Sequence, residues 1–175
     1  VQVSNRALSG KDSIRIADGS FVLQSGEDAI HAENDEDDTL GFVYIANGDF
    51  TINAGDDGIH SGSQVLIENG NIIMRECYEG IEGRSIDIIG GNITLTASDD
   101  GLNAAGGNDQ SSDWRGGRGE NPFAVEEGAY IRIAGGSLCI TAYGDGIDSN
   151  GDLYVTGGET YVSGPENSGN GSMDY

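Results

Sequence analysis

One apolar residue recurs along the chain at intervals near 22 residues, and this spacing constrains the fold more than any other feature. The separations between successive members are 22, 29, 22, 21, 45 and 26 residues. On a 22-residue period, the second gap therefore carries 7 extra residues, the fifth 23 and the last 4. Repeats of this length indicate stacked units that bury a shared core. The recurring residues, called anchors below, are Leu8, Ile30, Ile59, Ile81, Leu102, Ile147 and Met173.

A second pattern lies between successive anchors. Two short segments of alternating apolar residues flank a glycine at a fixed place, first in residues 14–23 and last in residues 153–162. With the segment at the anchor, this gives three short strands per repeat. Strands this short with no helix between them do not suit a βαβ sheet, and an antiparallel sandwich would not repeat its turns in register. We therefore predict an all-β parallel β-helix, a single-stranded solenoid of about six coils of 22 residues.

The repeat also predicts which side chains face the core. Four inward columns are expected, with Thr160 interrupting the third. Cys77 falls at a corner and Cys139 on an outward column, so we expect two free thiols. The columns are Ile14, Val43, Val65, Ile86, Ile131, Leu153; Ile16, Ile45, Ile67, Ile88, Ile133, Val155; Phe21, Phe50, Ile72, Ile93, Leu138; and Leu23, Ile52, Met74, Leu95, Ile140, Val162.

The charge of the chain excludes some partners. Its net charge is −22, from 30 acidic and 8 basic residues. Such a chain would not neutralise nucleic-acid phosphates, and it disfavours anionic lipid surfaces. No apolar run approaches the roughly 18 residues that a membrane span needs, so no membrane insertion is expected. Since the sequence shows no signal peptide or initiator methionine, we interpret it as a mature or trimmed chain, and its acidity favours an extracellular or cell-surface location.

Carboxylates occupy the position two residues before five successive anchors, which we call the acidic column: Asp28, Asp57, Glu79, Asp100 and Asp145. Stacked coils would hold them roughly 4.8 Å apart. Two charges at that distance repel by about 3.5 kcal/mol at an effective dielectric of 20. Because these acids would share the facing of the inward anchor, we expect them to be partly shielded.

Bridging calcium ions would offset this repulsion, since calcium takes 6–8 oxygen ligands in flexible geometry. Glycines that follow the acids would leave room for carbonyl groups or a ligand to approach. His31 and His60, one residue after their anchors, are interpreted as polar corner residues rather than zinc ligands, although His60 could join Asp57 in a mixed site. The candidate calcium ligands are Asp28, Asp56, Asp57, Glu79, Glu82, Asp99, Asp100, Asn103, Asp145 and Asp148.

The two longest insertions, residues 33–39 and roughly 107–128, both follow an anchor segment. They should therefore leave the same corner of the single domain formed by residues 1–175, beside the acidic column. The longer one contains the only tryptophan, Trp114, with Arg115 and Arg118. An exposed tryptophan with arginines suits sugar stacking and carboxylate binding, although it could equally anchor the loop. Tyr44 and Tyr154 share an outward column and are further candidates for sugar contacts.

Several phrases resemble one bacterial family. They are the Asp-Asp-Gly-Ile and Asp-Asp-Gly-Leu repeats at residues 56–59 and 99–102, Gly-Lys-Asp at 10–12, and the Gly-Asn-Gly-Ser-Met-Asp-Tyr ending. The family comprises secreted carbohydrate-binding domain proteins of clostridia and their relatives. The resemblance implies a right-handed parallel β-helix similar in shape to pectate lyases, several Ca²⁺ sites, and binding to cellulose and acidic pectic sugars such as polygalacturonate. Its calcium ligands would be Asp56, Asp57, Glu79, Asp99, Asp100, Asp145 and Asp148.

Several functions remain open from the residues alone. The leading one is a non-catalytic, calcium-binding polysaccharide-binding protein. A calcium-dependent, pectate-type polysaccharide lyase is the alternative, with Arg75 or Arg84 as base, Arg75 being placed on an outward station with Asn53 and Thr96. Hydrolysis by paired carboxylates and a purely structural spacer are further possibilities.

Overall fold

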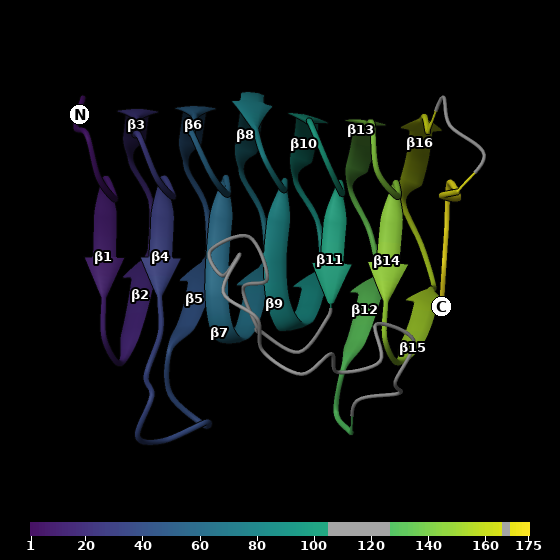
Figure 1. Cartoon of the computed structure of the whole chain (residues 1–175), viewed down its shortest axis with the longest axis horizontal. Helices are drawn as coiled ribbons and strands as arrows, with labels where there is room; N and C mark the ends of the chain where they lie inside the picture. Colours follow the sequence, from purple (N-terminus) through teal and green to yellow (C-terminus); the bar gives the residue numbers. More distant parts are fainter. Residues whose placement is uncertain (105–126, 166–168) are drawn as a thin grey trace.

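The computed structural model describes residues 1–104, 127–165 and 169–175, and all regular structure in these residues is β-strand. Every strand pairing is parallel, and the strands form one ten-stranded and one six-stranded sheet. Strands succeed one another along the long axis from the N-terminus to the C-terminus (Figure 1). The strands are β1 (Leu8–Gly10), β2 (Ser13–Ile16), β3 (Ser20–Gln24), β4 (Ile30–Ala32), β5 (Phe42–Ile45), β6 (Asp49–Asn53), β7 (Ile59–Ile67), β8 (Asn71–Cys77), β9 (Ile81–Ile88), β10 (Asn92–Ala97), β11 (Leu102–Ala104), β12 (Tyr130–Ile133), β13 (Ser137–Ala142), β14 (Ile147–Ser149), β15 (Asp152–Val155) and β16 (Glu159–Ser163).

The register of the pairing confirms the repeat. The anchor strands pair in the order β1-β4-β7-β9-β11-β14, and the six-stranded sheet runs β16-β13-β10-β8-β6-β3. Leu8 lies opposite Ile30, which lies opposite Ile59, and the same anchor alignment continues to Ile147. Each strand therefore pairs with its equivalent in the next repeat, whatever the length of chain between them.

The predicted columns form the core. Their members pair with one another in register, and in the middle repeats they are between 0% and 1% exposed. Burying such a side chain contributes about 1.5–3 kcal/mol. The last repeat differs, because Val155 is 52% exposed and Leu153 only half-buried. Within the described residues β15 pairs with β12 alone, so these two side chains have a neighbouring strand on one side only.

The expectation of three separate strands per repeat holds only in part. In β7 and β9 the anchor segment continues without a break into the next segment. A register shift between Ser61 and Gln64 accommodates the bend. The insertions instead separate strands: one lies between β4 and β5, the other between β11 and β12. Both therefore follow an anchor strand, as predicted, although most of the second lies outside the described residues.

The fixed glycine is required at each turn for two reasons. Gly48, Gly70 and Gly91 have φ angles of 140°, 132° and 93°, which L side chains rarely adopt. A Cβ atom on Gly91 would also lie 2.7 Å from the carbonyl oxygen of Gly70 in the preceding repeat. These glycines thus allow both the local backbone turn and the close approach of successive repeats.

The position assigned to Arg75 was wrong. Asn53 pairs with Glu76, not with Arg75, because the register of β8 shifts by one residue after Met74. Arg75 is the extra residue of this β-bulge and is exposed. An insertion of one residue cannot be seen from the period when the glycine and anchor on either side remain in place.

Both cysteines are free thiols, as predicted. Cys77 is buried at the end of β8, where burial raises the pKa of its thiol to about 12, and Cys139 is exposed. Because the thiolate is the reactive form, only Cys139 should react with a thiol reagent in the folded protein at pH 8. Thiol counting should give one reactive group per native chain, two in denaturant, and none in native Cys139→Ser. Two rapidly reacting thiols in the native protein would contradict this burial.

Candidate functional site

The acidic column lies outside the apolar core. The residue after each acid points inward instead: Ala29 is completely buried, and a Cβ atom on Gly58 would lie 2.6 Å from the Met74 Sδ atom. The acids therefore do not share the facing of the anchors, and the glycines after them make room for core side chains rather than for a ligand. Shielding was predicted correctly, since Asp28 and Asp57 are only 5% and 3% exposed.

Carboxylates of this column accept hydrogen bonds from the backbone of the next repeat. Asp28 Oδ1 accepts from the Asp57 amide at 3.1 Å, and Asp57 Oδ1 from the Glu79 amide at 3.2 Å. Asp100 Oδ1 accepts from the Asp145 amide at 2.5 Å, and Asp145 Oδ1 from the Gly171 amide. Such charge-assisted hydrogen bonds stabilise buried carboxylates. Four carboxylates of the acidic column are thus each held by a backbone amide of the following repeat.

In the first repeats, carboxylates of the acidic column contact histidine side chains. His31 Nδ1 lies 2.7 Å from Asp28 Oδ2, and His60 Nδ1 lies 2.5 Å from Glu82 Oε2 and 3.4 Å from Asp57 Oδ2. Burial would raise the pKa of Asp28, but the hydrogen bonds from His31 and from the Asp57 amide, together with the nearby histidines, outweigh burial and lower this pKa. Burial likewise opposes charging of His60, yet its bonds to Asp57 and Glu82 raise the pKa to about 11.

Glu79 interrupts this pattern in the acidic column. Its longer side chain accepts two contacts of 3.0 Å from Asn103 Nδ2. Burial raises the pKa of Glu79, as do the neighbouring charges of Glu82 and Asp57. Asp99 accepts a hydrogen bond from Tyr78, which raises the pKa of that phenol. Asn103 Oδ1 is buried and has no hydrogen-bond partner among the described residues.

In the last repeats, the acidic column has further carboxylates beside it and no histidines. Asp100, Asp145 and Asp148 each offer an oxygen within 4.8 Å of the others. No ion pair to a basic side chain involves them within the described ranges. Burial and the neighbouring carboxylates raise the pKa of Asp100 to about 7 and that of Asp148 to about 6. This cluster therefore holds more negative charge than its surroundings compensate.

The structure thus sorts the ten predicted calcium ligands into groups. Two sets of three carboxylates converge, Asp28 with Asp56 and Asp57, and Asp100 with Asp145 and Asp148. Glu82 joins Asp57 and His60 in a third group, the mixed arrangement that the sequence allowed for Asp57 and His60. Glu79 bonds to Asn103, and Asp99 to Tyr78.

A second polar cluster lies on the outward face of β9, β12 and β15. Asp87, 1% exposed, accepts hydrogen bonds from Gln64 Nε2 and the Tyr130 hydroxyl, both at 2.7 Å, and from Arg132 Nε. Tyr154 follows Arg132 in the same column and packs edge-on against Tyr130, with ring centroids 6.5 Å apart. Arg132 was not among the residues predicted to bind a ligand. It could have been found from its place in the outward column that contains Tyr44 and Tyr154.

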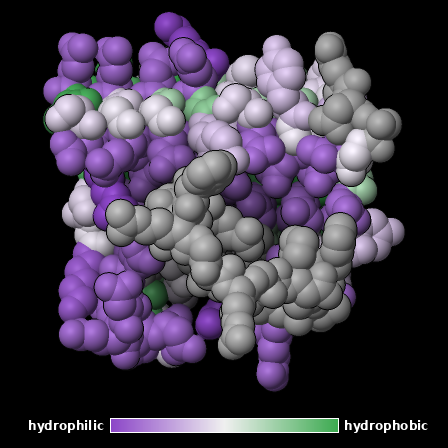
Figure 2. Space-filling model, in the orientation of Figure 1, coloured by the Kyte–Doolittle hydropathy of each residue, from purple (hydrophilic) through white to green (hydrophobic). Residues whose placement is uncertain are grey.

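The other sugar-binding candidates are spread out. Tyr44 and Tyr154 do share a column, but three repeats separate them, which corresponds to about 19 Å. The hydroxyl of Tyr44 donates to Glu68 at 2.8 Å. Trp114, Arg115 and Arg118 lie outside the described residues. Hydrophilic side chains dominate the face shown in Figure 2.

The two arginines considered as a lyase base lie in different surroundings. Arg75 projects from the bulge of β8. Arg84 Nη1 lies 3.5 Å from Asp38 Oδ2, in the connection between β4 and β5. These positions add nothing specific in favour of proton abstraction.

Comparison with known families agrees with the resemblance seen in the sequence. The family of carbohydrate-binding domain-containing proteins matches residues 1–118 and 78–174. The chain belongs to this family. Searches of curated proteins and of solved structures found no match. Among the described residues there is no helix long and apolar enough to cross a membrane.

The raised pKa values of Asp100 and Asp148 predict an inverted pH dependence of stability. Between about pH 4 and pH 7 the folded state holds protons that the unfolded chain has released, so the free energy of unfolding falls as pH rises. For chelator-treated protein, the melting temperature should therefore drop between about pH 4 and pH 7. Asp148→Asn should flatten this slope. A melting temperature that rises over the same window would contradict the assignment.

Proposed function

We propose that this chain is a non-catalytic, calcium-dependent polysaccharide-binding protein of the cell surface or secretome, and that it recognises plant cell-wall glycans. Family membership supports the carbohydrate part of this proposal. The observation that carries the calcium part is the cluster of Asp100, Asp145 and Asp148, three carboxylates with no basic partner in the described ranges. The acidic composition supports an extracellular location.

We further propose that the parallel sheets close into a right-handed β-helix. Each strand pairs with its equivalent one repeat later, in register, in both sheets. The side chains between the sheets form one continuous buried core. This arrangement is the one expected of stacked coils.

The C-terminal cluster fits calcium in its donor set. Three carboxylates supply oxygen ligands within 4.8 Å of one another. Asn103 pairs with Asp148 in the adjacent strand, and its buried Oδ1 has no hydrogen-bond partner among the described residues. Carbonyl and carboxylate oxygens are the ligands that calcium prefers. A bound calcium ion would hold Asp100, Asp145 and Asp148 together and relieve their repulsion.

The cluster around Asp87 fits a sugar-binding face. Buried Asp87 fixes Arg132 from one side, while the Arg132 side chain remains 47% exposed. Exposed Tyr154 and half-buried Tyr130 offer aromatic surface beside it. Arginine recognises carboxylates with two parallel hydrogen bonds, and aromatic rings pack on apolar sugar faces. This combination favours an acidic sugar such as a galacturonate unit, with calcium able to bridge protein and sugar carboxylates.

Calcium titration tests the metal part of the proposal. Calorimetry on chelator-stripped protein should show calcium binding, and the melting temperature at pH 8 should rise by about 2–4 °C for each kcal/mol of binding free energy. Asp148→Asn should lose most of this shift. Asp152→Asn, at the start of β15 and outside the cluster, is the control and should keep it. No heat and no shift at millimolar calcium would overturn the calcium site.

Glycan binding tests the sugar-binding face. Oligogalacturonate binding in calcium should weaken about tenfold, or by about 1.4 kcal/mol, in Arg132→Gln and in Tyr154→Ala. Arg15→Gln is a matched control, because Arg15 is an exposed arginine at the far end of the same outward column. Equal losses in all three variants would contradict a localised site. Formation of unsaturated uronate products during the assay would instead favour the lyase alternative.

A further inference from the structure

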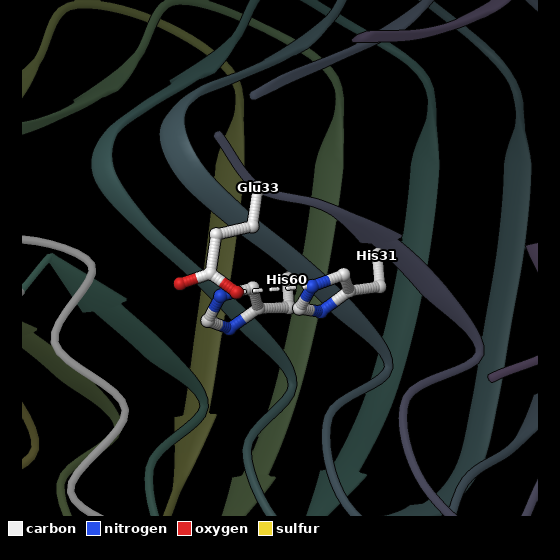
Figure 3. Close-up of side chains that lie close together, drawn as sticks. All are labelled: His31, Glu33 and His60. Atoms are coloured by element: carbon white, nitrogen blue, oxygen red, sulfur yellow. Dashed lines mark ion pairs between the residues drawn. The ribbon is translucent and has the colours of Figure 1, made fainter. Parts of the chain in front are cut away.

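A pair of stacked histidines lies beside the acidic column and uses only part of its hydrogen-bonding capacity. His31 in β4 and His60 in β7 are paired residues of adjacent strands. Their rings lie face to face, with centroids 4.6 Å apart and planes 8° from parallel. Both side chains are buried, at 4% and 2% exposure. Figure 3 shows the two rings with the Glu33 carboxylate next to them.

The two rings are held in the same way. Each Nδ1 atom faces a carboxylate, His31 that of Asp28 and His60 that of Glu82. In a neutral ring, a carboxylate at Nδ1 favours the form that carries its hydrogen there, so an ion that displaces the Nε2 proton of His60 would bind the Nε2 lone pair. Metal-binding histidines commonly have this second contact, which fixes ring orientation.

The Nε2 atoms of the two rings lie on the side of the pair that faces Glu33. His31 Nε2 lies 3.3 Å from Glu33 Oε2. His60 Nε2 is buried and has no hydrogen-bond partner among the described residues. A buried nitrogen without a hydrogen-bond partner is unfavourable. Since His31, His60 and Glu33 each offer a ligand atom within 4.8 Å of the others, the same small space is bordered by two imidazoles and one carboxylate.

We infer that His31, His60 and Glu33 bind a divalent transition-metal ion of the Zn²⁺ type. Tetrahedral zinc with bonds of about 2.0–2.2 Å has neighbouring ligand atoms roughly 3.4 Å apart, close to the separation of His31 Nε2 from Glu33. Because the two rings are stacked with planes 8° from parallel, His60 would have to rotate out of this stack to bind the same ion. Imidazole ligands suit zinc, copper and nickel, whereas calcium prefers oxygen, so this site differs in kind from the carboxylate cluster of Asp100, Asp145 and Asp148.

Such an ion would join two repeats and a loop. His31 and His60 lie on neighbouring strands, and Glu33 begins the connection between β4 and β5. The metal would therefore tie the start of this connection to the sheet. Three protein ligands also leave a coordination position open to water or to an exogenous ligand, as in zinc sites that are not purely structural.

Zinc titration into chelator-stripped protein in the presence of millimolar calcium tests this inference. Calorimetry should give a one-to-one isotherm with a Kd on the order of micromolar or tighter. Glu33→Gln should weaken binding at least tenfold; its side chain is partly exposed, so the fold should be retained. His60→Asn, in which the amide can still donate to Glu82 but Nε2 is removed, should abolish it.

Two control variants distinguish this site from non-specific binding of zinc to acidic residues. Glu36→Gln removes one negative charge from the same connection, where Glu36 pairs with Lys11, and should bind zinc normally. Asp148→Asn should also bind zinc normally, even if it loses calcium, so the two metal proposals can fail independently. Substitution with cobalt should give the visible absorption of a nitrogen-ligated ion. Absence of zinc binding, displacement of zinc by calcium, or unchanged affinity in folded Glu33→Gln would overturn the inference.

Discussion

In-register stacking is the constraint on which the rest of this structure depends. Parallel pairing of each strand with its equivalent one repeat later puts like side chains about one strand spacing apart along a column. For isoleucine and valine the result is favourable, because each layer completes the burial of the layer before it. For carboxylates the same geometry is unfavourable. Every polar column must therefore be compensated along its whole length.

The acidic column meets this requirement differently from one repeat to the next. Backbone amides of the following repeat serve Asp28, Asp57, Asp100 and Asp145 alike. Histidines one residue after the anchor contact these carboxylates in the first repeats. Glu79 uses an asparagine amide instead. In the repeat of Ile147, the residue after the anchor is an aspartate rather than a histidine or an asparagine. The negative charge there is incompletely compensated, and calcium is the proposed counter-charge.

The two proposed metal sites follow from this gradient along one column. At one end the station after the anchor holds imidazoles, whose Nδ1 atoms face carboxylates and whose Nε2 atoms lie near Glu33. At the other end the same station holds Asp148. One scaffold thus presents nitrogen ligands and oxygen ligands in separate places. The proposed sugar-binding face lies on a different column, where Asp87 is used to fix Arg132 rather than to bind a cation.

The sequence by itself determined the period, the parallel register, the apolar columns, the glycine turns and the acidic column, because a strict repeat transfers to space without knowledge of distant contacts. Tertiary structure alone decided what depends on contacts between columns. Such features include the inward-facing residue after each acid of the column and the bulge at Arg75. They also include the pairing of His60 with Glu82 rather than mainly with Asp57, and the fixing of Arg132 by Asp87. These features involve side chains from different stations, whose directions a one-dimensional pattern does not specify.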